Sequence, residues 1–333
     1  MAALGNLWPG AVAVSGGGDS VALMHLLADW ARARKLPAPK ILTVDHGLAA
    51  GSRKRASDVK AQARKLGLDC EVLSWKTSKP KSDIEARARE ARYRLMGEWC
   101  RANGVAFLYV AHSQDDQAET FLLRLARGSG LDGLSAMRNI APFPLENFSG
   151  LSLVRPLLGT ARDDLRRFLQ ARAIEWHEDP MNADPRFARV RLRVIRSELE
   201  KAGLTAARIA AAARHLARAR EVLERDTTLL LDTIIRRDGA RLLIDGPALA
   251  SAPRELGLRA LAELLKQTGG QTYRPRFEQL ETLFDSLSSG RFAARTLHGC
   301  RLGAAPKRLA IFGSGTLLLE KEPGRAKTRI KPS

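Results

Sequence analysis

The first residues that could do chemistry lie in a glycine-rich turn near the start of the chain. Residues 15–20 read Ser-Gly-Gly-Gly-Asp-Ser. Consecutive glycines let backbone N–H groups converge on an anion without obstruction by Cβ atoms. A carboxylate beside a bound anion makes sense if a divalent cation binds there too. We interpret the turn as a site for nucleotide phosphates, and a glycine turn without a ligand is the alternative. The residues of this site are Ser15, Gly16, Gly17, Gly18, Asp19 and Ser20.

Two familiar phosphate-binding patterns do not describe this turn. The pattern G-x-x-x-x-G-K-[ST] is absent, because no lysine follows the glycines. The dinucleotide pattern G-x-G-x-x-G also fails, because Val21 stands three residues after Gly18. The turn is therefore a phosphate loop of another type.

A second group of polar residues follows an apolar run at residues 105–110 and opens a helical pattern. Acidic residues at a helix N-terminus are favourable in themselves, and Ser113 with Asp116 fits a capping box. Carboxylates in this position also suit a bound cation, so capping and binding both stay open. The members of the group are His112, Asp115, Asp116 and Glu119.

Apolar patterns place both groups at the ends of strands. Short apolar runs read as strands, and apolar residues at helical spacing follow each of them. This alternation predicts βαβ units, and hence an α/β N-terminal domain with a Rossmann-like parallel sheet. Ligands of such sheets bind at the carboxyl ends of the strands, where both polar groups lie. The expected strands are 11–14, 40–45, 70–75 and 105–110, and the expected helices are 53–66, 82–103, 114–127 and one that begins at the glycine turn.

The regular alternation of strands and helices ends in the middle of the chain. There we expect a loop at 141–144 and helices at 162–173, 187–201 and 205–236. Short strands and glycine turns, with helices at 254–268 and 276–286, then predict a smaller α+β domain. The expected division is a catalytic domain at 1–200, a mainly helical linker at 201–225, and a C-terminal domain at 226–333 with a basic tail.

The composition excludes several classes of protein. The chain has 333 residues, 45% of them apolar, so it can bury a core and is not disordered as a whole. No uncharged apolar stretch approaches ~18 residues, so we expect no membrane span, and the first residues lack a signal-peptide pattern. Three scattered cysteines fit a reducing cytoplasm. The net charge of +19 favours an acidic partner such as a nucleic acid, or reflects a generally basic proteome.

The glycine turn resembles the pyrophosphate loop of the N-type ATP pyrophosphatases, which reads Ser-Gly-Gly-x-Asp-Ser after the first strand. Members of this group cleave ATP between the α and β phosphates and transfer AMP to a substrate oxygen. The resemblance implies an adenine nucleotide alpha hydrolase-like fold. The loop alone does not choose among the members.

Further segments resemble the tRNA(Ile)-lysidine synthetase family over residues 11–195, and residues 127–134 are the most specific. Met181 and Val190 depart from the serine and asparagine that the family usually has, which puts the polar contacts of that loop in question but not the catalytic core. The C-terminal part matches loosely, in size and position. The segments are VDHGL (44–48), EARAREARY (85–93), AHSQDDQAET (111–120), RLARGSGLDGL (124–134) and EDPMN (178–182).

By this resemblance the reaction modifies the wobble cytidine, position 34, of tRNA(Ile) with a CAU anticodon. ATP adenylates the C2 oxygen of the base, and the side-chain amine of free lysine then attacks C2 and releases AMP. The product is lysidine, and the codon read shifts from AUG to AUA. The resemblance thus implies ATP, free lysine and this tRNA as substrates, together with Mg²⁺. It implies no membrane partner and is compatible with a homodimer.

The resemblance also implies nucleotide-binding roles outside the loop. Asp45 and His46 would line the adenosine pocket, and Arg92 would stabilise the phosphates or the activated base. A histidine satisfied by the backbone is the alternative for His46. An exposed helix arginine paired with Glu85 or Glu90 is the alternative for Arg92.

Lysine and metal binding are assigned to the acidic residues. Asp116 and Glu119 would bind the lysine, while Asp19 and Asp115 would hold Mg²⁺. His112 is a candidate for the base that removes a proton from the attacking amine. The residues expected to act in catalysis are Asp19, Arg92, His112 and Asp116.

The RNA partner is expected to bind a basic segment. Residues 186–220 hold ten Lys or Arg against two Glu. Arg186, Arg189 and Arg193 recur at helical spacing and would contact tRNA phosphates in a salt-dependent way, while a solvated helix face is the alternative. We expect the C-terminal domain to bind the tRNA body. Candidates for stacking on unpaired bases are Trp176, Phe187 and Tyr273.

Two other functions fit the sequence less well. A tRNA 2-thiolation enzyme would use the same adenylation, but sulfur transfer normally needs paired cysteines or an iron–sulfur cluster, and Cys70 and Cys100 lie far apart in the sequence. A non-catalytic RNA-binding protein on the same fold would show a degraded loop, whereas this loop is intact.

Overall fold

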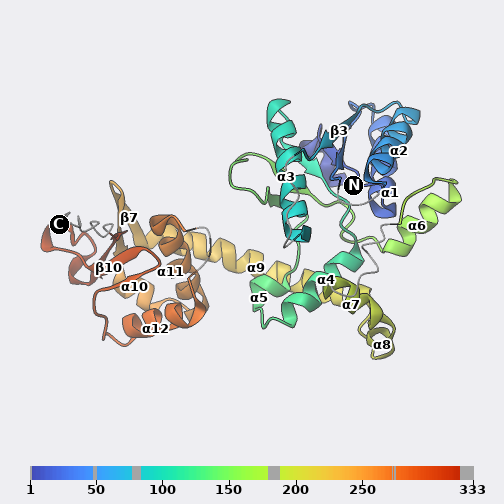
Figure 1. Ribbon diagram of the computed structural model, residues 1–333. Coiled ribbons are helices and arrows are strands. Elements are labelled where there is room, and N and C mark those ends of the chain that lie inside the picture. Colours follow the sequence, from blue (N-terminus) through green and yellow to red (C-terminus); the bar gives the residue numbers. More distant parts are fainter. Residues whose placement is uncertain are drawn as a thin grey trace, which may run out of the picture. The chain divides into compact units, whose positions relative to one another are not determined.

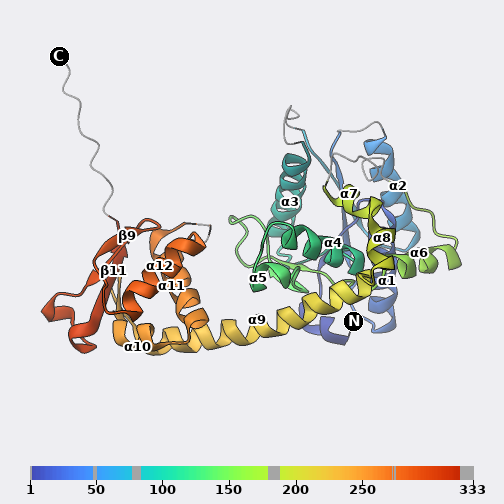
Figure 2. The same ribbon diagram turned by 90° about the horizontal axis from the view of Figure 1, so that it is seen from below.

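The computed structural model describes residues 2–47, 51–76, 84–178, 188–271, 273 and 275–322. The chain divides into two units, Met1–Arg218 and Ala219–Ser333, and the boundary lies within the long helix α9 (Ala206–Ile234) (Figures 1 and 2). Within the described ranges, no helix combines the length and apolar character that crossing a membrane requires.

The first unit is built on a mostly parallel sheet. Its strands lie in the order β3-β2-β1-β4-β6-β5, and each neighbouring pair is parallel except β5 with β6. This arrangement confirms the expected α/β fold. Because β1 and β4 are neighbours, the segments that follow them meet at one edge of the sheet. The strands are β1 (Ala11–Ala13), β2 (Lys40–Asp45), β3 (Cys70–Ser74), β4 (Phe107–Tyr109), β5 (Ile140–Pro142) and β6 (Ser152–Val154).

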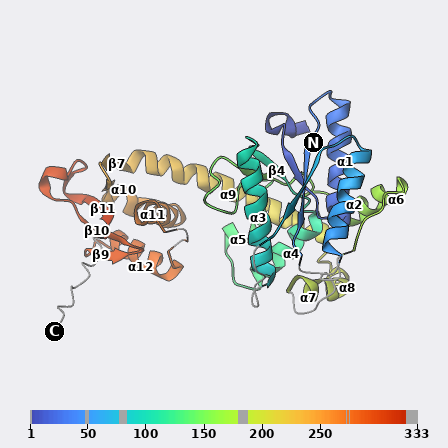
Figure 3. The same ribbon diagram turned by 45° about the horizontal axis from the view of Figure 1, so that its top comes forward.

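Helices cover both faces of this sheet (Figure 3). Helices α1 (Gly18–Ala33), α2 (Ser52–Lys65) and α6 (Arg162–Ala171) pack on the face that presents Val12 and Ile41. Helix α3 (Ile84–Ala102) packs on the opposite face, against Ala11 and Leu42. Neighbouring strand residues are thus buried on opposite faces, which explains why the strands read as continuous apolar runs. The unit also contains α4 (Gln114–Leu125), α5 (Leu131–Leu134) and a short 3₁₀ helix at Ala2–Leu7.

Two sequence expectations for the middle of the chain were wrong. The segment expected as a loop at 141–144 contributes to β5, which pairs antiparallel with the unpredicted strand β6. The helix expected at 187–201 is two helices, α7 (Ala188–Val194) and α8 (Arg196–Lys201). Strands of three residues are too short to show a period, and their pairing within the sheet decides their conformation.

The second unit is an α+β domain, as expected. Its antiparallel sheet has the order β7-β8-β11-β10-β9. Helices α10 (Gly246–Ser251), α11 (Arg254–Gly269) and α12 (Phe277–Ser288) share one apolar core with it. Gly257 lets α12 approach α11 closely, because a Cβ there would lie 2.0 Å from the Phe284 ring. The strands are β7 (Ile235–Asp238), β8 (Arg241–Asp245), β9 (Arg295–Leu297), β10 (Cys300–Ala304) and β11 (Thr316–Lys321), with 3₁₀ turns at Lys307–Leu309 and Gly313–Gly315.

Candidate active site

The glycine turn connects β1 to α1 and is shaped by its own side chains. Gly16 has a φ of +88°, a left-handed conformation that favours glycine. The Ser20 hydroxyl donates to the Gly17 carbonyl (2.8 Å) and accepts from the Ser15 N–H (3.1 Å). The Ser20 N–H donates to the Gly17 carbonyl (3.0 Å). The N–H groups of Gly18 and Asp19, in the first turn of α1, precede the α-helical hydrogen-bond pattern and are available to an anion. The turn thus has the form of a phosphate-binding loop.

The segment that contains Trp176 and His177, distant in the sequence, lies against this loop. The His177 N–H donates to the Gly16 carbonyl (2.9 Å), and the His177 ring contacts Asp58 of α2 (3.0 Å). The Trp176 ring lies against Gly18, where a Cβ would be 3.3 Å from Trp176 Cδ1. A larger residue at position 18 would therefore require the Trp176 ring to shift by a few tenths of an ångström.

The acidic residues at the start of α4 are buried and hydrogen-bonded. The Ser113 N–H and hydroxyl both donate to Asp116 Oδ2, at 2.8 and 2.9 Å. The capping box that the sequence suggested is therefore formed. Asp116 Oδ1 points elsewhere and accepts a hydrogen bond from Arg162 (3.0 Å). Capping thus uses one oxygen of this carboxylate, and the contact with Arg162 uses the other.

Arg162, at the start of α6, joins the glycine turn to these acids. Its Nε donates to Asp19 Oδ2 (3.0 Å), its Nη2 donates to Asp116 Oδ1 (3.0 Å), and its Nη1 lies 3.7 Å from Glu119 Oε1. Its guanidinium is largely buried, with 16% of the side chain exposed. The structure thus brings Asp19, Asp116 and Glu119 together around one cation.

These contacts change the acidity of both aspartates. Burial raises the pKa of Asp19, and the Arg162 guanidinium opposes this only in part. Burial would also raise the pKa of Asp116, but Arg162 and the hydrogen bonds from Ser113 hold it below its usual value. Asp116 is therefore ionised at neutral pH.

His112 is a neutral histidine in this site. Burial lowers its pKa to about 4, and the nearby Asp116 carboxylate limits the shift. Its Nδ1 accepts a hydrogen bond from Arg155 Nε (3.3 Å), so in the neutral ring the proton is assigned to Nε2. In this arrangement His112 can donate a hydrogen bond, whereas taking up a proton at Nδ1 requires loss of the Arg155 contact.

The comparisons with known proteins agree with this geometry. Residues 9–199 match the PP-loop domain family. The chain is 40% identical over 302 residues to the tRNA(Ile)-lysidine synthase of Ruegeria pomeroyi, which covers 90% of this chain and 69% of the relative. It is 40% identical over 329 residues to that of Methylobacterium nodulans, covering 96% and 93%, and 35% identical over 314 residues to that of Wolbachia pipientis, covering 93% and 72%.

The chain belongs to the tRNA(Ile)-lysidine synthase family. This membership makes it an ATP-dependent ligase with a PP-loop domain, in agreement with the expected function. It also favours the lysidine synthases over the 2-thiolation and non-catalytic alternatives.

Asp115 has a structural role in this lysidine synthase family member. Its Oδ2 accepts the backbone N–H of Arg162 (2.8 Å), at the start of α6, and its Oδ1 accepts from Arg196 Nη1 of α8 (2.8 Å). Asp115 therefore links α6 and α8 to α4 by hydrogen bonds. Each of its oxygens thus accepts one hydrogen bond, and the expected role of Asp115 at a metal stays a prediction.

The other nucleotide-binding candidates lie on neighbouring elements. Asp45 closes β2 and accepts from the Ser52 hydroxyl (2.6 Å) and the Gly47 N–H (3.2 Å). His46 follows it and is partly exposed. Arg92 is a partly exposed side chain of α3, on the opposite face of the sheet from α1.

The basic residues expected to bind RNA have different environments in the structure. Arg193 of α7 donates to both oxygens of Glu119, at 2.7 and 3.3 Å, so it borders the acidic group. Arg189 is partly exposed on the same helix. Arg186, Phe187 and the basic tail lie outside the described residues.

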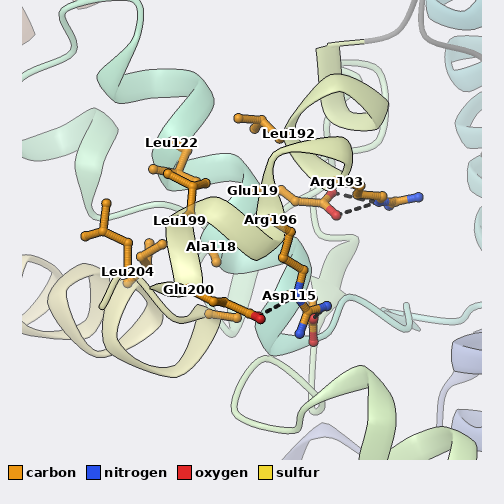
Figure 4. Close-up of a pocket in the computed structure, with 12 residues that line it drawn as sticks. Asp115, Ala118, Glu119, Leu122, Leu192, Arg193, Arg196, Leu199, Glu200 and Leu204 are labelled. Atoms are coloured by element: carbon orange, nitrogen blue, oxygen red, sulfur yellow. Dashed lines mark hydrogen bonds and ion pairs between the residues drawn. The ribbon is translucent and has the colours of Figure 1, made fainter. Parts of the chain in front are cut away.

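A pocket open to solvent lies beside Glu119, between α4, α7, α8 and the start of α9 (Figure 4). Its charged end is formed by Asp115, Glu119, Arg193, Arg196 and Glu200. Its wall is apolar, with Leu122, Leu192, Leu199 and Leu204 among the lining residues.

Sequence reasoning missed the arginines that complete the site. Arg155 follows β6, and Arg162 opens the next helix, so both lie at the edge of the sheet where the loop after β1 lies. The missed strand β6 was the signal that could have placed them, because it lies beside β4 in the sheet.

Proposed function

We propose that this chain joins lysine to C2 of the wobble cytidine, position 34, of tRNA(Ile) with a CAU anticodon. ATP is converted to AMP and pyrophosphate, and the product is lysidine. One observation supports this proposal beyond family membership: a single guanidinium, that of Arg162, contacts both Asp19 of the glycine turn and Asp116 of the acidic group at the start of α4, which we propose to bind the amine. An enzyme that activates a base with ATP and then attacks it with an amine needs these two functions in one place.

In the first step the cytidine O2 attacks the α-phosphorus of ATP, and pyrophosphate leaves. The loop at residues 15–20 would hold the phosphates with its N–H groups and hydroxyls. Asp19, with the phosphate oxygens of ATP, matches the donor set that Mg²⁺ prefers, and the ion would neutralise the leaving pyrophosphate. Asp45, His46 and Arg92 are proposed for the adenosine and the activated base.

In the second step the ammonium group of lysine first gives up one proton, to a carboxylate of the site or to solvent. The free amine then attacks C2, the C2–O bond breaks and AMP leaves. Asp116 and Glu119 would bind the ammonium form of lysine by charge-assisted hydrogen bonds. The apolar wall beside Glu119 would suit the alkyl chain of lysine, and Arg193 would suit its carboxylate. We propose that the neutral His112 orients a group through Nε2–H, whereas a role as the base requires it to leave Arg155.

The tRNA would bind through basic side chains. Arg186, Arg189 and the net charge of +19 support phosphate contacts along the first unit. We propose that the C-terminal domain, residues 226–333, binds the tRNA body. Tyr273 is 64% exposed there and offers a stacking surface.

The proposal is tested by measuring AMP formation from ATP and Mg²⁺ with each substrate omitted in turn. We expect sustained turnover that needs both the tRNA and free lysine. Turnover that needs a sulfur donor in place of lysine would reject the proposed nucleophile and retain the adenylation step.

A further inference from the structure

Arg162 contacts acidic residues from two separate parts of the fold. Asp19 belongs to α1, and Asp116 and Glu119 belong to α4, so the two helices meet at this guanidinium. The planar guanidinium directs Nε toward Asp19 and Nη2 toward Asp116, both at 3.0 Å. Because the donors are rigidly spaced, one side chain fixes the distance between the two carboxylates.

The backbone of Arg162 is also anchored. Its N–H donates to Asp115 Oδ2 (2.8 Å), and α6 packs on α1 through the buried Leu165 and Leu169. The backbone of Arg162 is thus anchored at the start of α6, while the three acidic side chains hold its guanidinium.

We propose that Arg162 is a positioning residue of the ligation reaction, which holds the ATP loop, through Asp19, at a fixed distance from the carboxylate of Asp116 that receives the lysine amine. The inference rests on the proposed function and adds a coupling between its two steps. Arg162 acts through the two aspartates and need not touch either substrate.

The test compares Arg162→Met and Arg162→Lys with Arg167→Met in the full chain. Arg167 lies on the same helix and pairs with Asp164 at the surface, so its substitution controls for loss of a helix arginine. Two quantities are measured: the rate of tRNA-dependent ATP–pyrophosphate exchange, and the KM for lysine in lysine incorporation.

We expect Arg162→Met to lower the exchange rate and to raise the KM for lysine, each by about 10-fold or more, because one partner of a buried charge pair is lost. A lysine nitrogen ends one bond short of the Nη atoms and cannot serve both aspartates in the fork geometry. Arg162→Lys should therefore recover part of the exchange rate and leave the KM for lysine raised. Arg167→Met should match the unmodified chain in both quantities.

The double variant Arg162→Met/Asp116→Asn distinguishes a positioning role from a general loss of structure in the site. If Arg162 acts on lysine through Asp116, then Arg162→Met adds little to the KM for lysine of Asp116→Asn. The inference is overturned if the two substitutions raise the KM for lysine by factors that multiply in the double variant. It is also overturned if Arg162→Met folds and leaves both the exchange rate and the KM for lysine unchanged. If Arg162→Met does not fold, judged by thermal unfolding, Arg162→Lys decides by the same two quantities. A failure of the proposed function is distinct, because the unmodified chain would then incorporate no lysine.

Discussion

The backbone N–H of His177 donates a hydrogen bond of 2.9 Å to the carbonyl of Gly16. A segment late in the first unit thereby fixes the first glycine of the phosphate loop, at a φ of +88°. Alanine reaches such a conformation at a cost of about 1–3 kcal/mol. The loop geometry, and not the presence of glycines alone, is therefore what ATP use should depend on.

Gly16→Ala should impair ATP use beyond its effect on stability. Gly150 is a matched control, because it also has a φ of +88° and a Cβ there would meet nothing within 4 Å. We expect similar losses of stability in thermal unfolding, with a raised KM for ATP in Gly16→Ala alone. An equal change of KM in both variants would mean that the loop conformation is not what binds ATP.

Asp116→Asn should impair lysine use more than adenylation. The amide oxygen can still accept from Ser113, so the cap is retained, while the charge that would bind an ammonium group is lost. We expect at least about a 10-fold rise in the KM for lysine and a smaller fall in ATP–pyrophosphate exchange. Asp164→Asn, at the surface of α6, is the control. If exchange is lost as fully as lysine incorporation, the assignment of Asp116 to lysine is wrong.

Asp115→Asn should lower stability more than it changes the dependence on Mg²⁺. Asp115 accepts the first N–H of α6 and a hydrogen bond from Arg196, and loss of such contacts costs about 1–3 kcal/mol. Asp19→Asn should instead raise the Mg²⁺ concentration needed for half-maximal activity. Denaturant unfolding and Mg²⁺ titration distinguish the two variants. A raised Mg²⁺ requirement in Asp115→Asn and not in Asp19→Asn would support Asp115 as the metal ligand.

His112 should remain neutral across the physiological pH range. Its pKa is lowered from the ordinary value of 6.5 to about 4. Between these pH values the unfolded chain binds a proton at this imidazole that the folded chain does not bind. The free energy of unfolding should therefore fall as the pH decreases from 6.5 to about 4. NMR titration of the His112 ring measures the pKa directly, and His112→Gln should weaken the pH dependence of stability. A His112 pKa near 6.5 would contradict the neutral assignment.

The sequence predicted those parts of the structure that depend on local pattern. The strand, glycine turn and helix around residues 11–33 show a clear change of period, and so does the capped helix that begins at Gln114. Strands β5 and β6 have three residues each, too few to show a period, and they depend on pairing: β6 pairs with β4, and β5 pairs with β6.

Contacts between distant residues left no pattern in the sequence. Arg162 is separated from Asp19 by 143 positions, and in a chain this rich in arginine nothing marks it out. The carboxylates were found because they stand at helix starts after strands. The arginines that hold them became identifiable once the order of the strands was known.

The most direct test of the account is incorporation of labelled lysine into purified tRNA, with ATP and Mg²⁺. We would compare tRNA(Ile) bearing CAU with tRNA(Met), and the unmodified chain with Asp19→Ala. The account predicts label on tRNA(Ile) alone, and its loss in Asp19→Ala. Absence of label from tRNA(Ile) while AMP is still released in a tRNA-dependent reaction would contradict lysine as the nucleophile.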